Sequence, residues 1–151
     1  MKTTRVVLAD DHPIVRASLR RLLEKAGDIE VVGEASDGME TIHMVEELAP
    51  DVLLLDVEMP GMKGFEVARR LQAAGASVRI LALSAYDDKQ YILAMLASGA
   101  TGYLTKEEAP QTIIHAVREA VEGRTDQENP AHKEDAPGPD NPSGAEQPRS
   151  D

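Results

Sequence analysis

Four positions that could do chemistry each close or follow a short apolar segment of the chain. They carry an acid pair, a single acid, a hydroxyl and an amine: Asp10 and Asp11 after residues 5–9, Asp56 at the end of 51–56, Ser84 at the end of 78–84 and Lys106 after 101–105. An unpaired charge is costly to take out of water. Apolar segments that end in carboxylates therefore indicate a site that holds a cation or a ligand.

Phosphoryl transfer is the chemistry that this set of groups favours. Neighbouring carboxylates repel one another unless a cation lies between them. Oxygen ligands with one open side suit Mg²⁺, which keeps waters and shares a phosphate oxygen. Asp56 at a rigid strand end is a candidate nucleophile toward phosphorus. Ser84 can donate a hydrogen bond to phosphoryl oxygens, and Lys106 can neutralise their charge.

The elements that must position these residues are short strands alternating with longer helical segments. The predicted strands are 5–9, 30–35, 51–56, 78–84 and 101–105, and the predicted helices are 13–26, 38–48, 64–74, 87–98 and 109–122. Predicted helix ends are the N-caps Asp37 and Asp87 and the stops Gly27, Gly75 and Gly99. In 13–26, one apolar stripe comprises Ile14, Val15, Leu19, Leu22 and Leu23.

This alternation predicts an α/β fold, with a parallel sheet covered by helices on both faces and joined by right-handed crossovers. In such a sheet, ligands bind beyond the carboxyl ends of the strands. The three acids, Ser84 and Lys106 all fall at that one edge of the predicted sheet. The fold prediction and the chemical prediction therefore agree on the place of the site.

With these residues in place, the chain resembles the receiver domain of two-component response regulators. The matching segments cover essentially all of 1–123 and are LADDHPIVR (8–16), PDVLLLDVEMPGMKG (50–64), LALSA (81–85) and ASGATGYLTK (97–106). The NarL/LuxR-type subfamily is the one that the chain resembles most, by the motifs DDHP and MPGM and by the segment QTIIHAVREAVEG (111–123). The resemblance implies a flavodoxin-like, doubly wound (βα)5 fold with strand order 2-1-3-4-5.

The resemblance also implies a role for each site residue. Asp56 is the expected phosphoacceptor. Asp10 and Asp11 are expected to hold Mg²⁺ together with Asp56 and the backbone carbonyl of Glu58, with Mn²⁺ as a substitute. Ser84 and Lys106 are expected to bind the phosphoryl group, and the implied switch pair is Ser84 with the aromatic ring of Tyr103.

A sensor histidine kinase is the partner that the resemblance implies, with a homodimer on phosphorylation as a further expectation. The chain is not expected to be an enzyme beyond its own phosphorylation and dephosphorylation. NarL/LuxR-type regulators usually continue into a helix-turn-helix domain, whereas here residues 124–151 are acidic and Pro-rich. Direct nucleic-acid binding by this chain is therefore not expected.

Composition agrees with this interpretation. The 151 residues include 27 acids and 16 Lys+Arg, a net charge of -11, which disfavours nonspecific binding to nucleic acid or anionic membrane. There is no cysteine, so disulfides and thiolate metal sites are excluded. No apolar run approaches the ~20 residues that a membrane helix needs, and no signal peptide is recognisable before Asp10. The sequence predicts a cytoplasmic protein.

Two rival functions stay open at this point. A strand ending LLLDVE resembles the haloacid-dehalogenase phosphatases, which also use a strand-end Asp with Mg²⁺. Their motif places Asp and Thr where this chain has Glu58 and Met59, and they lack an acid pair on an earlier strand. The other rival is an interaction module that works without phosphate. That class is expected to lose the acid pair, the nucleophile or the lysine, and all are present here.

A basic stripe on segment 13–26 comprises Arg16, Arg20 and Arg21. It fits either solvated ion pairs with nearby glutamates or a docking surface for a kinase or a second subunit. We favour docking for this stripe from the sequence.

Removing residues 124–151 is expected to leave the melting temperature nearly unchanged. That segment holds five Pro, seven acids and three Lys+Arg, and no apolar side chain larger than Ala. Such a segment has little apolar surface to bury, so we predict a disordered tail or linker beside a folded unit at 1–123. Thermal melts of the full chain and of residues 1–123 test this. A loss of several degrees on truncation would show that the segment docks on the domain.

Overall fold

The computed structural model describes residues 2–84 and 89–122 of the chain. Five strands alternate with five helices: β1 Thr4–Ala9, α1 Pro13–Glu24, β2 Ile29–Ala35, α2 Gly38–Leu48, β3 Val52–Asp56, α3 Gly64–Ala73, β4 Arg79–Ser84, α4 Lys89–Ala97, β5 Gly102–Thr105 and α5 Pro110–Glu122. All ten predicted elements are present, and their boundaries within the described residues differ from the predicted ones by at most two residues. The predicted tail at 124–151 and the predicted cap Asp87 lie outside the described residues.

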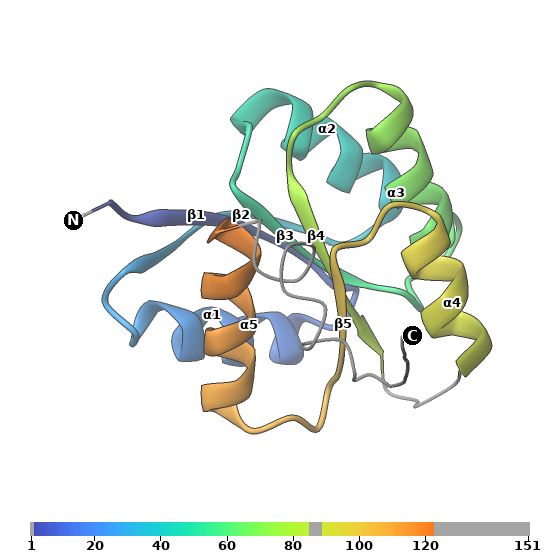
Figure 1. Ribbon diagram of the computed structural model, residues 1–151. Helices are drawn as coiled ribbons and strands as arrows, with labels where there is room; N and C mark the ends of the chain where they lie inside the picture. The colour runs from blue at the N-terminus through green and yellow to red at the C-terminus, as the bar shows by residue number, and fades with distance from the viewer. Residues whose placement is uncertain (1, 85–88, 123–151) are drawn as a thin grey trace, which may run out of the picture. The chain divides into compact units, whose positions relative to one another are not determined.

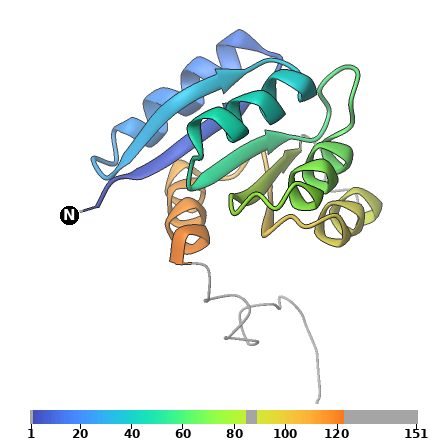
Figure 2. The same ribbon diagram turned by 90° about the horizontal axis from the view of Figure 1, so that it is seen from above.

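The strands form one parallel sheet in the order β2-β1-β3-β4-β5 (Figure 1). Figure 2 shows the dark-blue β1 between the light-blue β2 and the green β3. This order confirms the flavodoxin-like fold. The chain adds β2 on one side of β1 and β3, β4 and β5 on the other, so the topological switch point lies between β1 and β3. Ligands of such sheets bind at the carboxyl ends of the two strands that flank this point.

Alternation along the strands divides the core into two layers. Val6 and Leu8 of β1 pack toward α1 and α5, whereas Val7 and Ala9 pack toward α2 and α3. The central strand β3 is buried along its whole length, from Val52 to Asp56. A strand that is covered on both faces reads as a continuous apolar run, which explains the sequence VLLLD.

The helix ends follow the predicted signals. The Asp37 side chain accepts a hydrogen bond from the Glu40 backbone N–H at 2.8 Å and so caps α2. The predicted stops Gly27, Gly75 and Gly99 adopt φ of +87°, +79° and +108°. Glycine tolerates this left-handed backbone without the clash that a Cβ atom causes.

The apolar stripe predicted for α1 is wrong at its first residue. Ile14 is 81% exposed, whereas Leu23 is fully buried. Ile14 lies in the first turn of α1, where the chain has just left β1 at the carboxyl edge of the sheet. Helical periodicity assigns a residue to a stripe, but it does not say whether the sheet extends far enough to cover that turn.

Within the parts of the chain that the structure describes, no helix combines the length and the apolar character needed to cross a lipid bilayer.

Candidate phosphoryl-transfer site

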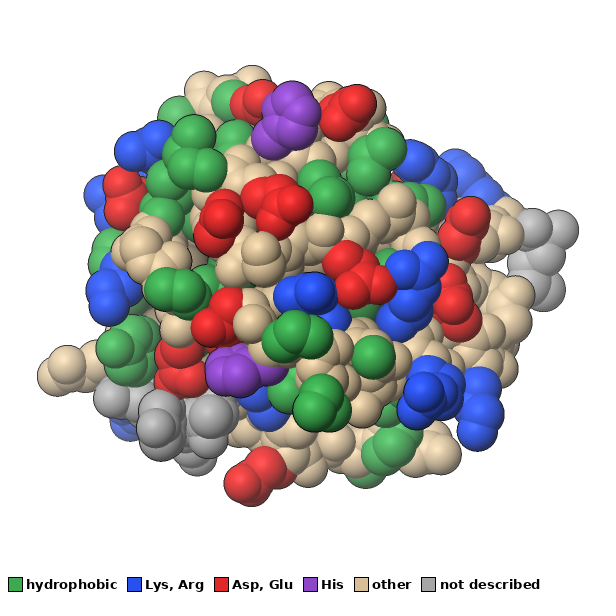
Figure 3. Space-filling view, turned by 180° about the vertical axis from the view of Figure 1, so that it is seen from behind, with side chains coloured by type: hydrophobic (Ala, Val, Ile, Leu, Met, Phe, Trp, Pro, Cys, Tyr) green, Lys and Arg blue, Asp and Glu red, His purple; other side chains and the backbone are tan. Residues whose placement is uncertain are grey.

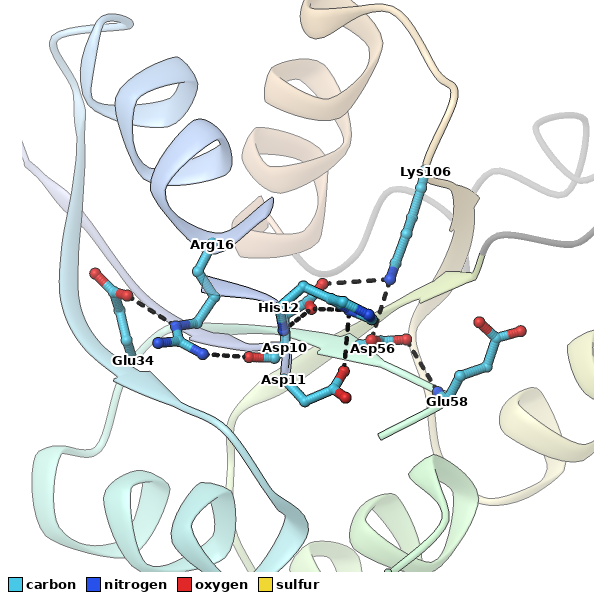
Figure 4. Close-up of polar contacts among 8 residues, drawn as sticks. All are labelled: Asp10, Asp11, His12, Arg16, Glu34, Asp56, Glu58 and Lys106. Atoms are coloured by element: carbon cyan, nitrogen blue, oxygen red, sulfur yellow. Dashed lines mark hydrogen bonds and ion pairs between the residues drawn. The ribbon is translucent and has the colours of Figure 1, made fainter. Parts of the chain in front are cut away.

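Asp56 lies at the carboxyl end of β3 and its side chain is buried, with 0% of the residue exposed (Figure 4). Its Oδ2 accepts a hydrogen bond from Lys106 Nζ at 3.0 Å. Its Oδ1 accepts one from the backbone N–H of Glu58 at 2.9 Å. The two oxygens are therefore held in a fixed orientation by one ammonium and one peptide group.

The acid pair follows β1 and lies beside Asp56. Asp10 is 1% exposed, and its Oδ2 lies 3.3 Å from Lys106 Nζ. Asp11 is more accessible, with 26% of its side chain exposed. Lys106, which directly follows β5, thus forms ion pairs with carboxylates from two different strand ends. The predicted gathering of Asp10, Asp11, Asp56 and Lys106 at one edge is present in the structure.

The pKa values of the central pair reflect this crowding. Burial raises the pKa of Asp56 above its ordinary value, and the hydrogen bonds from Glu58 and Lys106 offset only part of that rise, since the Asp10 charge adds to it. Burial lowers the pKa of Lys106, but the bonds and charges of Asp56 and Asp10 outweigh burial and raise it. Lys106 is consequently a cation at neutral pH.

The acid cluster fits a small hard cation. Among the described residues, Asp10 Oδ2 and Asp11 Oδ1 are buried oxygens that accept no hydrogen bond. Ligand atoms of Asp10, Asp11, His12 and Asp56 lie within 4.8 Å of one another. Lys106 Nζ lies 3.3 Å from Asp10 Oδ2, and His12 Nδ1 lies 3.1 Å from Asp11 Oδ1. Three carboxylates nevertheless share the charge of one lysine, and buried negative charge that is not neutralised is costly. A divalent ion that prefers oxygen ligands, such as Mg²⁺, would satisfy these atoms.

Ser84 and Tyr103 lie next to this cluster. Ser84 ends β4 with 0% exposure, and its Oγ donates a hydrogen bond to Glu58 Oε2 at 3.5 Å. Tyr103 is half-buried on β5, where it packs against the core layer that contains Ala82, its partner across the β4–β5 ladder. The structure thus brings the Ser84 hydroxyl to the predicted edge of the sheet, where one of its contacts is with Glu58, two residues after Asp56.

His12 contacts the acid pair more directly than its sequence position indicated. Its Nδ1 lies 3.2 Å from Asp10 Oδ1 and 3.1 Å from Asp11 Oδ1. Its backbone N–H also donates to Asp10 Oδ1 at 2.8 Å. This backbone hydrogen bond shapes the loop before Pro13. The contacts of the ring are additional and were not predicted.

The basic stripe of α1 is mostly engaged within the molecule. Arg16 Nε donates to Glu34 Oε1 at 2.9 Å, and one terminal nitrogen of Arg20 donates to Glu34 Oε2 at 2.6 Å. The structure confirms the ion-pair interpretation of the stripe for these two residues. The docking interpretation that we favoured from the sequence stays a prediction. Arg16 lies in the first turn of α1, close enough in sequence to the acid pair to donate to the Asp10 carbonyl oxygen at 2.6 Å.

Acidic and basic side chains are interspersed over the face of the molecule in Figure 3. A nucleic-acid interface needs basic residues gathered on one face. On the face shown, the charge distribution lacks that feature.

Comparison with known proteins matches residues 6–118 to the family model of the response regulator receiver domain. The nitrate/nitrite response regulator NarL of Escherichia coli K12 is 40% identical over 118 residues, which cover 78% of this chain and 55% of the relative. The response regulator UvrY of the same strain is 40% identical over 119 residues, covering 79% of this chain and 55% of the relative. The chain thus spans about half the length of these relatives.

Solved structures agree with the sequence matches. The receiver domain of a NarL response regulator from Mycobacterium tuberculosis has a TM-score of 0.80 at 38% identity, covering 82% of this chain and 100% of that one. The receiver domain of RcsB from Salmonella enterica, solved in the presence of the phosphomimetic BeF3⁻, has a TM-score of 0.74 at 29% identity. That match covers 81% of this chain and 91% of the RcsB chain.

Proposed function

Because the chain belongs to the family of response regulator receiver domains, we propose that Asp56 is its phosphoacceptor and that a sensor histidine kinase is the donor. The observation that carries this proposal is the buried Asp56 carboxylate at the end of β3, with Lys106 Nζ at 3.0 Å. A structural ion pair would not require two further carboxylates at the same place. A site for an incoming phosphoryl group does, since it must hold a cation as well as a nucleophile.

The proposed step is a displacement at phosphorus. One oxygen of the Asp56 carboxylate forms a bond to the phosphorus atom. The bond from phosphorus to its previous partner breaks, and that partner is an imidazole nitrogen of the kinase or the acetate oxygen of acetyl phosphate. The leaving atom keeps the electron pair, and the imidazole takes a proton from solvent. The product is an aspartyl phosphate, which water later hydrolyses by attack on the same phosphorus.

The protein's own groups act by positioning and by charge. Lys106 remains protonated and neutralises a phosphoryl oxygen, in the place where it now holds Asp56 Oδ2. Mg²⁺, held by Asp10, Asp11, Asp56 and the backbone carbonyl of Glu58, would supply the remaining charge neutralisation. Asp10 Oδ2 and Asp11 Oδ1, which accept no hydrogen bond from the described residues, support this assignment.

Ser84 and Tyr103 are the proposed switch. In this proposal the Ser84 hydroxyl leaves Glu58 and donates to the phosphoryl group, and the half-buried Tyr103 ring then turns inward. The consequence is a changed contact surface around β4 and β5. The structure of the related RcsB receiver with BeF3⁻ supports the idea that this fold accommodates a phosphoryl mimic.

The effect of phosphorylation on partners of the protein is a second part of the proposal. The relatives are response regulators, and this chain spans 55% of their length. We propose that residues 1–123 are the receiver unit, that 124–151 form a tail or linker, and that phosphorylation alters contacts with a protein partner or a second copy of the chain. In this proposal the reaction takes place in the cytoplasm.

Phosphorylation is expected to depend on a divalent ion. Incubation with acetyl phosphate and Mg²⁺ should add the mass of one phosphoryl group to the intact chain, because three carboxylates and one lysine leave excess negative charge around the reacting phosphorus. Chelation of the metal should prevent the addition, and Mn²⁺ should restore it. Intact-mass spectrometry checks this. Equal phosphorylation with excess chelator would contradict the proposed site.

A further inference from the structure

Arg16 links the acid site to the edge strand of the sheet (Figure 4). One of its terminal nitrogens donates to the backbone carbonyl oxygen of Asp10 at 2.6 Å, and its Nε donates to Glu34 Oε1 at 2.9 Å. The Arg16 side chain is 18% exposed, so the guanidinium is largely shielded from water. It is therefore a bridge between α1, β2 and the loop that carries the acid pair.

The Asp10 carbonyl is part of the peptide group that joins Asp10 to Asp11. On the other side of Asp10, its backbone N–H donates to the Ala35 carbonyl at 2.9 Å, which extends the ladder between β1 and β2. The main chain at Asp10 is thus held from both sides. Among the described residues, Asp11 Oδ1 accepts no hydrogen bond, and its contact with a nitrogen is the one with His12 Nδ1 at 3.1 Å, from the same loop. The orientation of the Asp10–Asp11 peptide group therefore helps to set the position of the Asp11 carboxylate.

The position of Glu34 depends on an irregularity in β2. The register between β1 and β2 shifts after Val6, so that Val7 pairs with Gly33 and Leu8 with Glu34. Strict alternation from Val31 would place Glu34 on the α2 side of the sheet. The extra residue moves it to the α1 side, which is the face of Leu8. The bulge is therefore what brings Glu34 to Arg16.

We propose that Arg16, held by Glu34, is a positioning residue that sets the cation preference of the acid pair. It fixes the peptide group between Asp10 and Asp11 and thereby holds their carboxylates at the spacing of a small cation. Mg²⁺ demands ligands at about 2.0–2.1 Å in near-octahedral geometry, whereas Ca²⁺ accepts about 2.3–2.6 Å in flexible geometry. A stiff loop therefore favours Mg²⁺, and a loosened loop loses that preference.

Arginine suits this task because its planar fork donates in two directions at once, whereas a lysine ammonium is a single point charge. The second arginine at Glu34 strengthens the arrangement. Arg20 donates to the other carboxylate oxygen and, together with Arg16, lowers the pKa of Glu34, although burial opposes this. Glu34 is consequently an anion at neutral pH and a firm anchor for Arg16.

The sign of the effect separates positioning from electrostatics. Arg16 is a cation near a site for cations, so its charge alone weakens metal binding, and its removal would strengthen it. A positioning role predicts the opposite. The loss of an outer residue that orients the direct ligands of a metal typically lowers metal affinity by about 10- to 100-fold.

This inference rests on the proposed function and is tested by metal binding alone, without phosphodonor. The full chain, labelled with ¹⁵N, is titrated with MgCl2 or CaCl2 while backbone amide signals are followed by NMR. Arg16→Met is expected to raise the Kd for Mg²⁺ about tenfold and the Kd for Ca²⁺ much less. Arg16→Lys keeps the positive charge but loses the planar fork of donors. It should therefore also raise the Kd for Mg²⁺ and lower the ratio of the Ca²⁺ Kd to the Mg²⁺ Kd.

The matched control is Arg118→Met. Arg118 forms a two-armed pair with Asp28, at 2.9 and 2.8 Å, beside the amino end of β2 and therefore at the opposite edge of the sheet. This variant should lower stability without changing either Kd. Unchanged or stronger Mg²⁺ binding in both Arg16 variants would overturn the inference and leave the proposed function standing. Failure of the wild-type chain to bind Mg²⁺ would overturn both.

Discussion

Replacement of Asp56 by asparagine is expected to abolish phosphorylation by acetyl phosphate while the protein stays folded. The amide has no charged oxygen to attack phosphorus, so the reaction loses its nucleophile. The fold should persist because asparagine is nearly isosteric and its Oδ1 can still accept the Glu58 N–H. Lys106 keeps Asp10 as a counter-charge.

Intact-mass spectrometry with Mg²⁺ present measures the result, and a thermal melt verifies the fold. Asp51→Asn is the matched control, because it makes the same change at the other end of β3, where Asp51 accepts a hydrogen bond from the Arg5 backbone. The control should be phosphorylated like the wild type. Substantial phosphorylation of Asp56→Asn would mean that another residue is the acceptor.

Replacement of Asp11 by alanine is expected to stabilise the metal-free protein and to remove its response to Mg²⁺. Asp10, Asp11 and Asp56 converge, and their neighbouring cationic groups are Lys106 and, when protonated, His12. Deleting the Asp11 carboxylate relieves repulsion on the order of 1 kcal/mol, since the group is partly solvated. That corresponds to a rise in melting temperature of roughly 4 °C for a domain of this size.

With Mg²⁺ the order should reverse. A ligand that binds only the folded state stabilises it by RT ln(1 + [L]/Kd), about 1.4 kcal/mol at ten times the Kd, and Asp11→Ala lacks one of the expected metal ligands. Melts of both proteins in chelator and in millimolar Mg²⁺ measure the two effects. Glu30→Ala removes one negative charge from an exposed position of β2 and serves as the control. If Asp11→Ala is no more stable in chelator and gains as much from Mg²⁺ as the wild type, the three acids do not form one site.

The place of the site was determined by the sequence alone. Short apolar segments alternating with helical ones predict a parallel sheet, and the carboxyl ends of parallel strands meet at one edge. The sequence therefore predicts that Asp10, Asp56 and Lys106 come together, although the first two are 46 positions apart. The sequence also predicts that the strand leading to Asp56 is buried, because a continuous apolar run is typical of a strand that is covered on both faces.

The tertiary structure decided which partner each side chain meets. Arg16 could have faced solvent, a kinase or any nearby glutamate, and it meets Glu34 because an extra residue in β2 turns that glutamate to the α1 face. Alternation predicts the opposite face. Ile14, likewise, belongs to an apolar stripe by its spacing and is nevertheless exposed, since its turn extends past the sheet. Periodicity assigns residues to faces and edges, whereas contacts near 3 Å depend on strand register and on where each helix lies along the sheet.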